Sequence, residues 1–204
     1  MRIVSTGIYY ALALLAAGAL VAWLTMPVLA APMVILAIFC LYFFRDPDRE
    51  IPQGPVAVSP ADGKVIELRP EGGLQRVTIF LNVFDVHVNR TPIGGTIDRV
   101  QYQTGKFLVA SKPECSADNE QNIVTVTGDG STVIFKQIAG LIARRIVFDK
   151  KPGDRVATGQ RIGLIKFGSR CDVLFGPEWE ITVRPGQRVA AGSSVIARRL
   201  DRKS

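Results

Sequence analysis

The sequence predicts a mainly β barrel-sandwich domain, preceded by an N-terminal α-helical membrane hairpin. Three observations lead to this fold class. Residues 7–44 contain no charged side chain. Short runs rich in Val, Ile, Thr and Phe then follow one another, separated by Gly, Pro, Asp or Asn, which is the pattern of short strands joined by turns. Finally, a pattern that begins with a Pro-Gly turn occurs twice near the C-terminus.

The uncharged run predicts membrane attachment. It is too long for the apolar region of a signal peptide and long for a single span, which needs about 20 residues. Pro27 and Pro32 divide it into segments at about 8–24 and 33–44. We therefore expect two helices, with a single tilted span and a shallow re-entrant hairpin as the alternatives.

The charges that flank this run predict its orientation. Arg2 precedes the run, and Arg45 and Arg49 follow it. Because positively charged residues favour the cytoplasmic side, a hairpin would keep both of its ends there. We therefore assign residues 1–45 to an anchor at the cytoplasmic face of the cell membrane and residues 46–204 to the β-rich domain.

The strands of the second domain are expected where β-branched and aromatic residues cluster between turn residues. Convincing amphipathic helices are scarce in this part of the sequence. We expect strands at residues 56–59, 63–68, 76–81, 95–102, 122–127, 132–138, 145–148, 160–166, 178–183 and 194–197.

The repeat gives a more specific prediction of the fold. Residues 151–162 and 184–195 share a Pro-Gly turn, a short Val-centred strand, a second Gly turn and another strand. These units resemble the hammerhead turns of biotinyl- and lipoyl-type barrels, which implies a fold element and not carrier function. A carrier would need a Lys flanked by Met at a hairpin tip, and all three Met precede Val34.

Composition argues against several classes of function. Cys40 lies in the apolar run, whereas Cys115 and Cys171 lie in polar sequence, and the chain has a single histidine. This pattern fits a reducing compartment and leaves too few ligands for a metal site. The net charge of +7 comes without a nucleic-acid-binding motif. We therefore expect an anionic lipid surface as the partner, and no nucleic acid.

Three residues have the types needed to activate a hydroxyl group. Ser169 follows Gly168 between the two copies of the repeat, Asp62 lies in an Asp-Gly turn, and His87 is the only imidazole. Serine is a poor nucleophile until an imidazole accepts its proton, and a carboxylate on the far ring nitrogen then holds the tautomer. No Gly-x-Ser-x-Gly elbow is present, which weakens an ordinary hydrolase interpretation.

The segments around these residues resemble a known family. They read Ser-Pro-Ala-Asp-Gly-Lys-Val at 59–65, Phe-Asp-Val-His-Val-Asn-Arg-Thr-Pro at 84–92 and Lys-Phe-Gly-Ser-Arg at 166–170. Together they are similar to phosphatidylserine decarboxylase proenzymes, particularly the short membrane-attached branch of bacteria and archaea. The resemblance implies a catalytic β domain in which Asp62, His87 and Ser169 act as acid, base and nucleophile.

The resemblance also implies self-cleavage. Ser169 would attack the Gly168 carbonyl, and β-elimination of the resulting ester would lead to a pyruvoyl group at position 169. A large chain, 1–168, and a small chain, 169–204, would remain together as a heterodimer. A higher homo-oligomer is left open.

The activity implied by the resemblance is decarboxylation of phosphatidylserine in the membrane. The pyruvoyl carbonyl would form a Schiff base with the serine headgroup and withdraw electrons as CO2 leaves, giving phosphatidylethanolamine without a separate cofactor. His87 would then return a proton. The alternatives are an archaetidylserine-type decarboxylase and, with less support, a membrane-tethered Ser/His/Asp hydrolase.

Two further segments provide candidate substrate contacts. Asn119 and Glu120 match an acidic-amide run of the family, although Gln121 stands where we expect Arg; a solvated turn is the alternative. Arg144 and Arg145 have the guanidinium geometry that suits a lipid phosphate. Adjacent strand residues face opposite ways, so we expect only one of the two to bind it.

Overall fold

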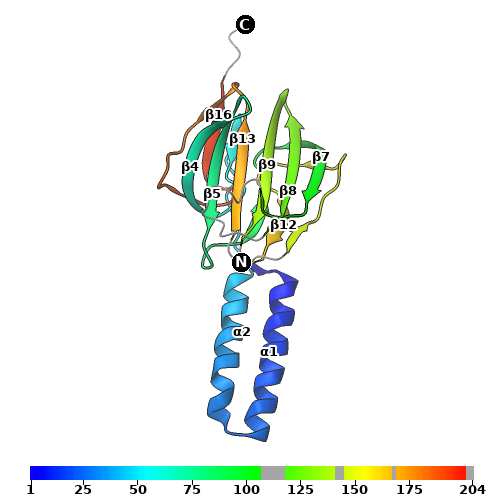
Figure 1. Ribbon diagram of the computed structural model, residues 1–204, viewed down its shortest axis with the longest axis vertical. Coiled ribbons are helices and arrows are strands. Elements are labelled where there is room, and N and C mark those ends of the chain that lie inside the picture. The colour runs from blue at the N-terminus through cyan, green and yellow to red at the C-terminus, as the bar shows by residue number, and fades with distance from the viewer. Residues whose placement is uncertain (107–117, 141–144, 167–168, 201–204) are drawn as a thin grey trace. The chain divides into compact units, whose positions relative to one another are not determined.

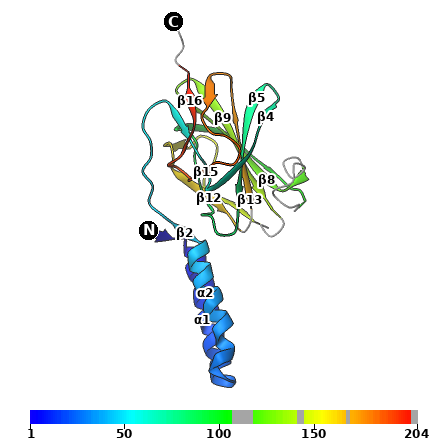
Figure 2. The same cartoon turned by 90° about the vertical axis from the view of Figure 1, so that its left-hand side faces the viewer.

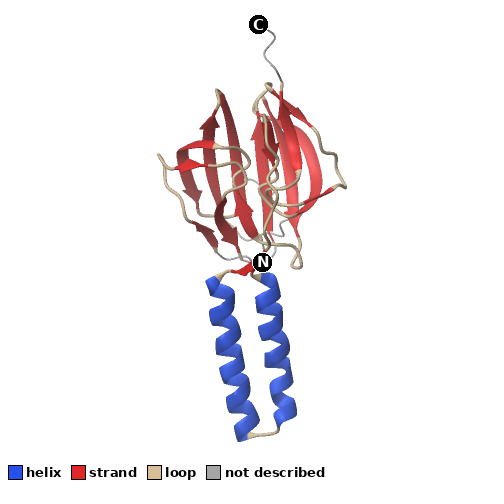
Figure 3. Cartoon of the chain, turned by 180° about the vertical axis from the view of Figure 1, so that it is seen from behind, coloured by secondary structure: helices blue, strands red, loops and turns tan. Residues whose placement is uncertain are grey.

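The computed structural model describes residues 1–106, 118–140, 145–166 and 169–200. Contacts divide the chain into two units, Met1–Asp48 and Arg49–Ser204. The first consists mainly of helices and the second of strands, as the colouring in Figure 3 shows. The predicted fold class, a mainly β chain with an N-terminal helix pair, is confirmed.

The first unit is a helical hairpin. Helix α1 (Ser5–Leu24) is followed by a 3-10 turn, η1 (Pro27–Ala30), and by helix α2 (Ala31–Phe43). Proline at the start of η1 ends the first helix because proline cannot continue an α-helical ladder. Two short strands, β1 (Arg2–Ile3) and β2 (Arg45–Asp46), pair at the open end of the hairpin.

The surface of these helices fits an apolar environment. Helix α1 is long and apolar enough to cross a membrane by length and composition, and Pro27–Phe43 is a shorter apolar stretch. Gly7 allows close packing within the hairpin, since a Cβ there would lie 2.4 Å from Cβ of Phe44. Large apolar side chains such as Trp23 and Leu24 remain exposed. This pattern suggests membrane association.

The second unit is built from antiparallel strands (Figures 1 and 2). Its main curled sheet has eight strands in the order β11-β7-β8-β9-β13-β5-β4-β15. Two three-stranded sheets have the orders β10-β12-β6 and β14-β16-β3. The strands are β3 (Val56–Val58), β4 (Gly63–Glu71), β5 (Leu74–Leu81), β6 (Val88–Arg90), β7 (Gly95–Gln103), β8 (Gln121–Gly128), β9 (Ser131–Ala139), β10 (Ile146–Phe148), β11 (Arg155–Val156), β12 (Arg161–Ile165), β13 (Ser169–Phe175), β14 (Trp179–Ile181), β15 (Arg188–Val189) and β16 (Val195–Arg199).

Strand β13 occupies the interior of the main sheet. It pairs with β5 on one side and with β9 on the other, and every one of its residues is buried. Successive side chains of a strand point to opposite faces of the sheet. Cys171, Val173 and Phe175 therefore face the hydrophobic core, whereas Arg170 and Asp172 face the other side.

The two copies of the repeat form the opposite edges of the main sheet. In the first copy β11 pairs with the start of β7, where Val156 lies opposite Gly95. In the second copy β15 pairs with the start of β4, where Val189 lies opposite Gly63. Both glycines have positive φ, and a Cβ at either one would lie 2.2 Å from a backbone oxygen of the neighbouring strand. The repeat in the sequence is therefore a repeat of the same edge structure.

Replacing Gly95 by Ala is expected to destabilise the domain by roughly 3 kcal/mol, because the new methyl group would meet the Thr127 carbonyl at a strained φ of 154°. Gly73→Ala is the matched control. Its φ is 82° but no atom lies within 4 Å of the added methyl, so we expect a loss of about 1–2 kcal/mol. Denaturant unfolding of the two variants measures the difference, and equal losses would contradict the steric explanation.

Candidate active site

Ser169 begins strand β13 and is fully buried. It lies opposite Leu81 of β5 and Ala139 of β9. Within the part of the chain that the structure describes, its Oγ is a buried polar atom without a hydrogen-bond partner. Buried hydroxyl groups are normally hydrogen-bonded, and an unmet one costs about 1–3 kcal/mol. A buried hydroxyl retained at this cost is a candidate for a reacting group. Gly168 lies outside the described residues.

His87 immediately precedes strand β6 and is also buried. Its Nδ1 lies 2.9 Å from the backbone carbonyl oxygen of Asp85. A carbonyl oxygen can only accept a hydrogen bond, so Nδ1 carries the proton in this contact. In the neutral ring this leaves Nε2 with the lone pair. His87 is therefore held in the tautomer that can accept a proton at Nε2.

Two contacts link the segment that contains His87 with residues on either side of Ser169. The His87 carbonyl accepts a hydrogen bond of 3.2 Å from the amide of Ile165, at the end of the strand that leads toward Ser169. Two residues beyond His87, Nδ2 of Asn89 lies 3.7 Å from Sγ of Cys171, which is two residues beyond Ser169. Ile165 and Cys171, which precede and follow Ser169 in the sequence, are therefore both in contact with the segment from His87 to Asn89.

Asp62 makes different contacts from those of a catalytic triad. Both of its carboxylate oxygens accept hydrogen bonds from Nη2 of Arg49, at 3.0 and 2.9 Å. One of them also accepts a hydrogen bond of 2.8 Å from the Ala191 amide, in the second repeat. The Asp85 carbonyl, and not a carboxylate, is the partner of His87 Nδ1. The acid role of Asp62 stays a prediction.

The candidate substrate contacts that the structure describes, Asn119, Glu120 and Arg145, lie on segments that bond residues close to Ser169 in sequence or in strand pairing. Nδ2 of Asn119, which is buried, donates to the Ala139 carbonyl at 2.7 Å, and Ala139 lies opposite Ser169. A hydrogen bond with the Glu120 side chain, together with burial, raises the pKa of Tyr102 to about 12. The Arg145 carbonyl accepts a hydrogen bond from the Lys166 amide. Arg144 lies outside the described residues.

A row of buried amides lies next to Ser169 on the core side of the sheet. Asn122 Nδ2 donates to Gln137 Oε1 at 3.1 Å, and Gln137 Nε2 donates to Asn89 Oδ1 at 2.8 Å. Cys171 follows in this row. Burial, with a smaller effect of the Asp172 carboxylate, raises the pKa of the Cys171 thiol far above its usual value. The thiol therefore stays neutral and does not compete with Ser169 as a nucleophile.

Ion pairs hold β13 on its other face. The Arg170 guanidinium donates to both oxygens of Asp172, at 2.7 and 3.1 Å, and to Thr78 Oγ1 at 3.1 Å. Arg76 pairs with Glu67 at 2.6 Å, beside Asp172 at 3.9 Å. Because these groups are charged, paired and mostly buried, removing one partner would leave a buried charge without compensation.

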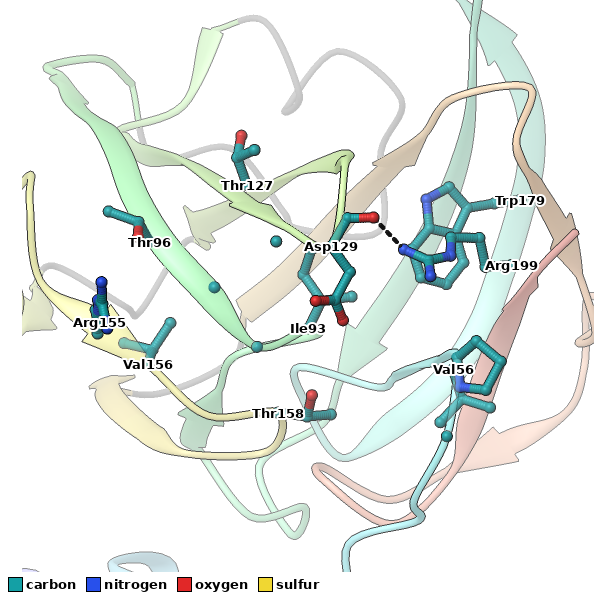
Figure 4. A pocket seen from close by; sticks show the side chains of 15 residues that line it. Val56, Ile93, Thr96, Thr127, Asp129, Arg155, Val156, Thr158, Trp179 and Arg199 are labelled. Carbon is teal, nitrogen blue, oxygen red and sulfur yellow. Dashed lines mark hydrogen bonds between the residues drawn. The ribbon is translucent and has the colours of Figure 1, made fainter. Parts of the chain in front are cut away.

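A pocket of about 430 Å³ lies away from this site. It is lined by Thr127 and Gly128, at the far end of β8 from Gln121, and by the side chains of Arg155 and Arg199 (Figure 4). Neither Ser169 nor His87 lines it. Among the residues that the structure describes, no group of three His, Cys, Asp or Glu side chains could hold a metal ion. The candidate active site is therefore the Ser169 end of β13.

Comparisons with known proteins agree with the earlier resemblance. A family model described as phosphatidylserine decarboxylase matches residues 36–197. A curated protein named phosphatidylserine decarboxylase proenzyme, from Solibacter usitatus, is 80% identical over 204 residues, covering 100% of both chains. Proteins of the same name from Erythrobacter litoralis and Solidesulfovibrio magneticus are 45% and 46% identical, over 93% and 90% of this chain and 84% and 88% of their own.

Proposed function

Because the chain belongs to the phosphatidylserine decarboxylase family, we propose that it cuts itself between Gly168 and Ser169 and uses the new residue 169 to decarboxylate phosphatidylserine. Membership of the family makes the chain a carboxy-lyase proenzyme of phospholipid biosynthesis. The observation that carries the proposal for this site is the buried Ser169 hydroxyl at the start of a central strand, which has no hydrogen-bond partner among the described residues.

Self-cleavage begins with the transfer of a proton. His87 Nε2 takes the proton from Ser169 Oγ, and Oγ attacks the carbonyl carbon of Gly168. The peptide bond becomes an ester, and the nitrogen of Ser169 becomes an amine. Loss of the Ser169 Cα proton then breaks the Cβ–Oγ bond and releases Gly168 as a carboxylate. The dehydroalanine left at position 169 takes up water and loses ammonia, which gives the pyruvoyl group.

The residues around position 169 fit such a group. A pyruvoyl group at position 169 would supply a carbonyl that serves as an electron sink for an amino-acid headgroup. Burial of position 169 keeps bulk water from the reacting atoms. His87 delivers a proton to the carbon that has lost CO2. The Cys171 thiol remains protonated beside them and does not add to the carbonyl as a thiolate.

Three side chains are the proposed contacts of the lipid headgroup. The Glu120 carboxylate suits the ammonium group, and the guanidinium of either Arg144 or Arg145 suits the phosphate. Asn119 holds the Ala139 carbonyl beside position 169 and can orient the substrate from there. Asp62, paired with Arg49 and with the Ala191 amide, supports the turn that leads into β4.

The two products of cleavage would form a heterodimer. The small chain would begin with β13, which lies between β5 and β9 of the large chain. For the membrane anchor, the length and apolar surface of α1 support insertion. We place the site at the cytoplasmic face because Arg2 and Arg45 flank the hairpin.

A cleavage and turnover experiment tests this function. The purified chain, incubated with vesicles that contain phosphatidylserine, should release CO2 and form phosphatidylethanolamine. Denaturing electrophoresis should show two chains, and mass spectrometry should show a small chain lighter by one ammonia than residues 169–204. Active protein that remains a single 22.2 kDa chain would contradict the proposal. Vesicles with an ether-linked serine lipid separate the archaetidylserine-type activity from the ester-lipid activity.

A further inference from the structure

We propose that Arg188, which follows the cleavage site in the sequence, is a positioning residue for His87 and acts through Asp85. The inference rests on the proposed function, since it concerns the base that serves Ser169. Arg188 lies in the part of the sequence that would become the small chain, whereas Asp85 and His87 lie in the large one.

Asp85 links Arg188 to His87 through its carboxylate and its backbone carbonyl. The Asp85 carboxylate accepts a hydrogen bond of 2.9 Å from Nη1 of Arg188. The backbone carbonyl of the same Asp85 lies 2.9 Å from His87 Nδ1. A shift of the carboxylate away from Arg188 therefore displaces the carbonyl that sets the tautomer of His87.

Asp85 is held in a tight turn that transmits such a shift. Its second carboxylate oxygen accepts a hydrogen bond of 2.9 Å from the Asn82 amide, and its own amide donates to the Asn82 carbonyl at 3.0 Å. The Asp85 side chain is only 9% exposed. A carboxylate this buried needs a positive partner, and Arg188 is the cation that the described residues place against it.

The second repeat fixes the position of Arg188. Strand β15 aligns Arg188 with Lys64 and Val189 with Gly63, and Val189 is buried in the core. Two backbone hydrogen bonds join Val65 to the turn that precedes Arg188. The Gly186 amide donates to the Val65 carbonyl at 2.8 Å, and the Val65 amide donates to the Gln187 carbonyl at 2.9 Å. The backbone of Arg188 is therefore held firmly, although its side chain is 65% exposed.

The first repeat provides a matched control within the same chain. Arg155 occupies the equivalent position, followed by Val156, on the edge strand β11. Its side chain lines the pocket shown in Figure 4. The two arginines share their sequence context and their edge strand, and they differ in what they contact. A variant at Arg155 therefore controls for loss of an arginine from a repeat edge.

Kinetics of Arg188→Ala provide the first test. We expect self-cleavage and kcat to fall by about 10- to 100-fold, the cost of removing an outer partner that orients a reacting group. KM for phosphatidylserine vesicles should stay within about twofold, because Arg188 is not proposed to touch the lipid. Arg188→Lys, which keeps the cation, should restore most of the rate. Arg155→Ala should match the parent.

Several outcomes would overturn the inference. One is an unchanged kcat in Arg188→Ala, and another is an equal loss of kcat in Arg155→Ala. A third is a rise in KM alone in Arg188→Ala, which would instead indicate that Arg188 binds the lipid phosphate directly. An uncleaved or inactive parent protein would be a failure of the proposed function and not of the role of Arg188. The parent is therefore measured alongside every variant.

A spectroscopic test does not depend on activity. His87 is the only histidine in the chain, so ¹⁵N-histidine labelling gives signals from one ring, provided that the purification tag contains no histidine. In the uncleaved Ser169→Ala background, two-bond ¹H–¹⁵N spectra should show the tautomer protonated at Nδ1. Adding Arg188→Ala should give a mixture of tautomers, whereas adding Arg155→Ala should not. An unchanged single tautomer in Arg188→Ala would refute the proposed link.

Discussion

Replacing Ser169 by Ala is expected to leave a single 22.2 kDa chain with no measurable decarboxylation. The change removes the attacking hydroxyl and, with it, the precursor of the reactive carbonyl, so we expect a loss of at least about 10⁴-fold in both cleavage and turnover. Electrophoresis and release of CO2 from phosphatidylserine vesicles measure the two effects.

The same variant should fold at least as stably as an uncleaved parent. Oγ of Ser169 has no hydrogen-bond partner in the described structure, so its removal costs no hydrogen bond there and relieves a desolvated polar group. Cys171→Ser is the control for a change of similar size in the same strand, and its chain should still be cut. A Ser169→Ala protein that still separates into two chains would show that the cut lies elsewhere.

Replacing His87 by Ala should slow self-cleavage by about 10²- to 10⁴-fold, the contribution expected of a positioned general base. No other imidazole in the chain could replace it. The rate of appearance of the small chain measures the effect. Cleavage at the parental rate would contradict the role of His87 as the base for Ser169.

The His87 variant also separates the two proposed roles of the ring. Any protein that cleaves on long incubation can be purified and assayed with phosphatidylserine vesicles. A low kcat in this cleaved protein would indicate that His87 also returns the proton during turnover. A parental kcat would limit His87 to self-cleavage.

Much of the fold could be predicted from the sequence because its signals are local. The prolines at 27 and 32 marked the turn between α1 and α2, and the two copies of the repeat became the edge strands β11 and β15. Strand β6 was not expected, because Val88–Arg90 shows neither alternation nor an apolar run. Asn89 and Arg90 are buried there through contacts with segments far away in the sequence, which no local pattern reveals.

The candidate site could be predicted less completely. Ser169 and His87 stood out by motif, and contacts of Ile165 with His87 and of Cys171 with Asn89 link their two segments. The Asp85 carbonyl could not be predicted, because every residue has a carbonyl and only the fold decides which one meets a ring nitrogen. Arg188 was also missed, since the repeat makes it indistinguishable in sequence from Arg155.

The central position of β13 has a consequence for how the mature enzyme can be made. After cleavage this strand would belong to a separate polypeptide, yet it would still be hydrogen-bonded on both sides by the other chain. Neither polypeptide could then close the main sheet alone, because removing β13 would split the sheet between β5 and β9. The enzyme would fold once, as a continuous chain, and mixing the two polypeptides after denaturation should not regenerate it.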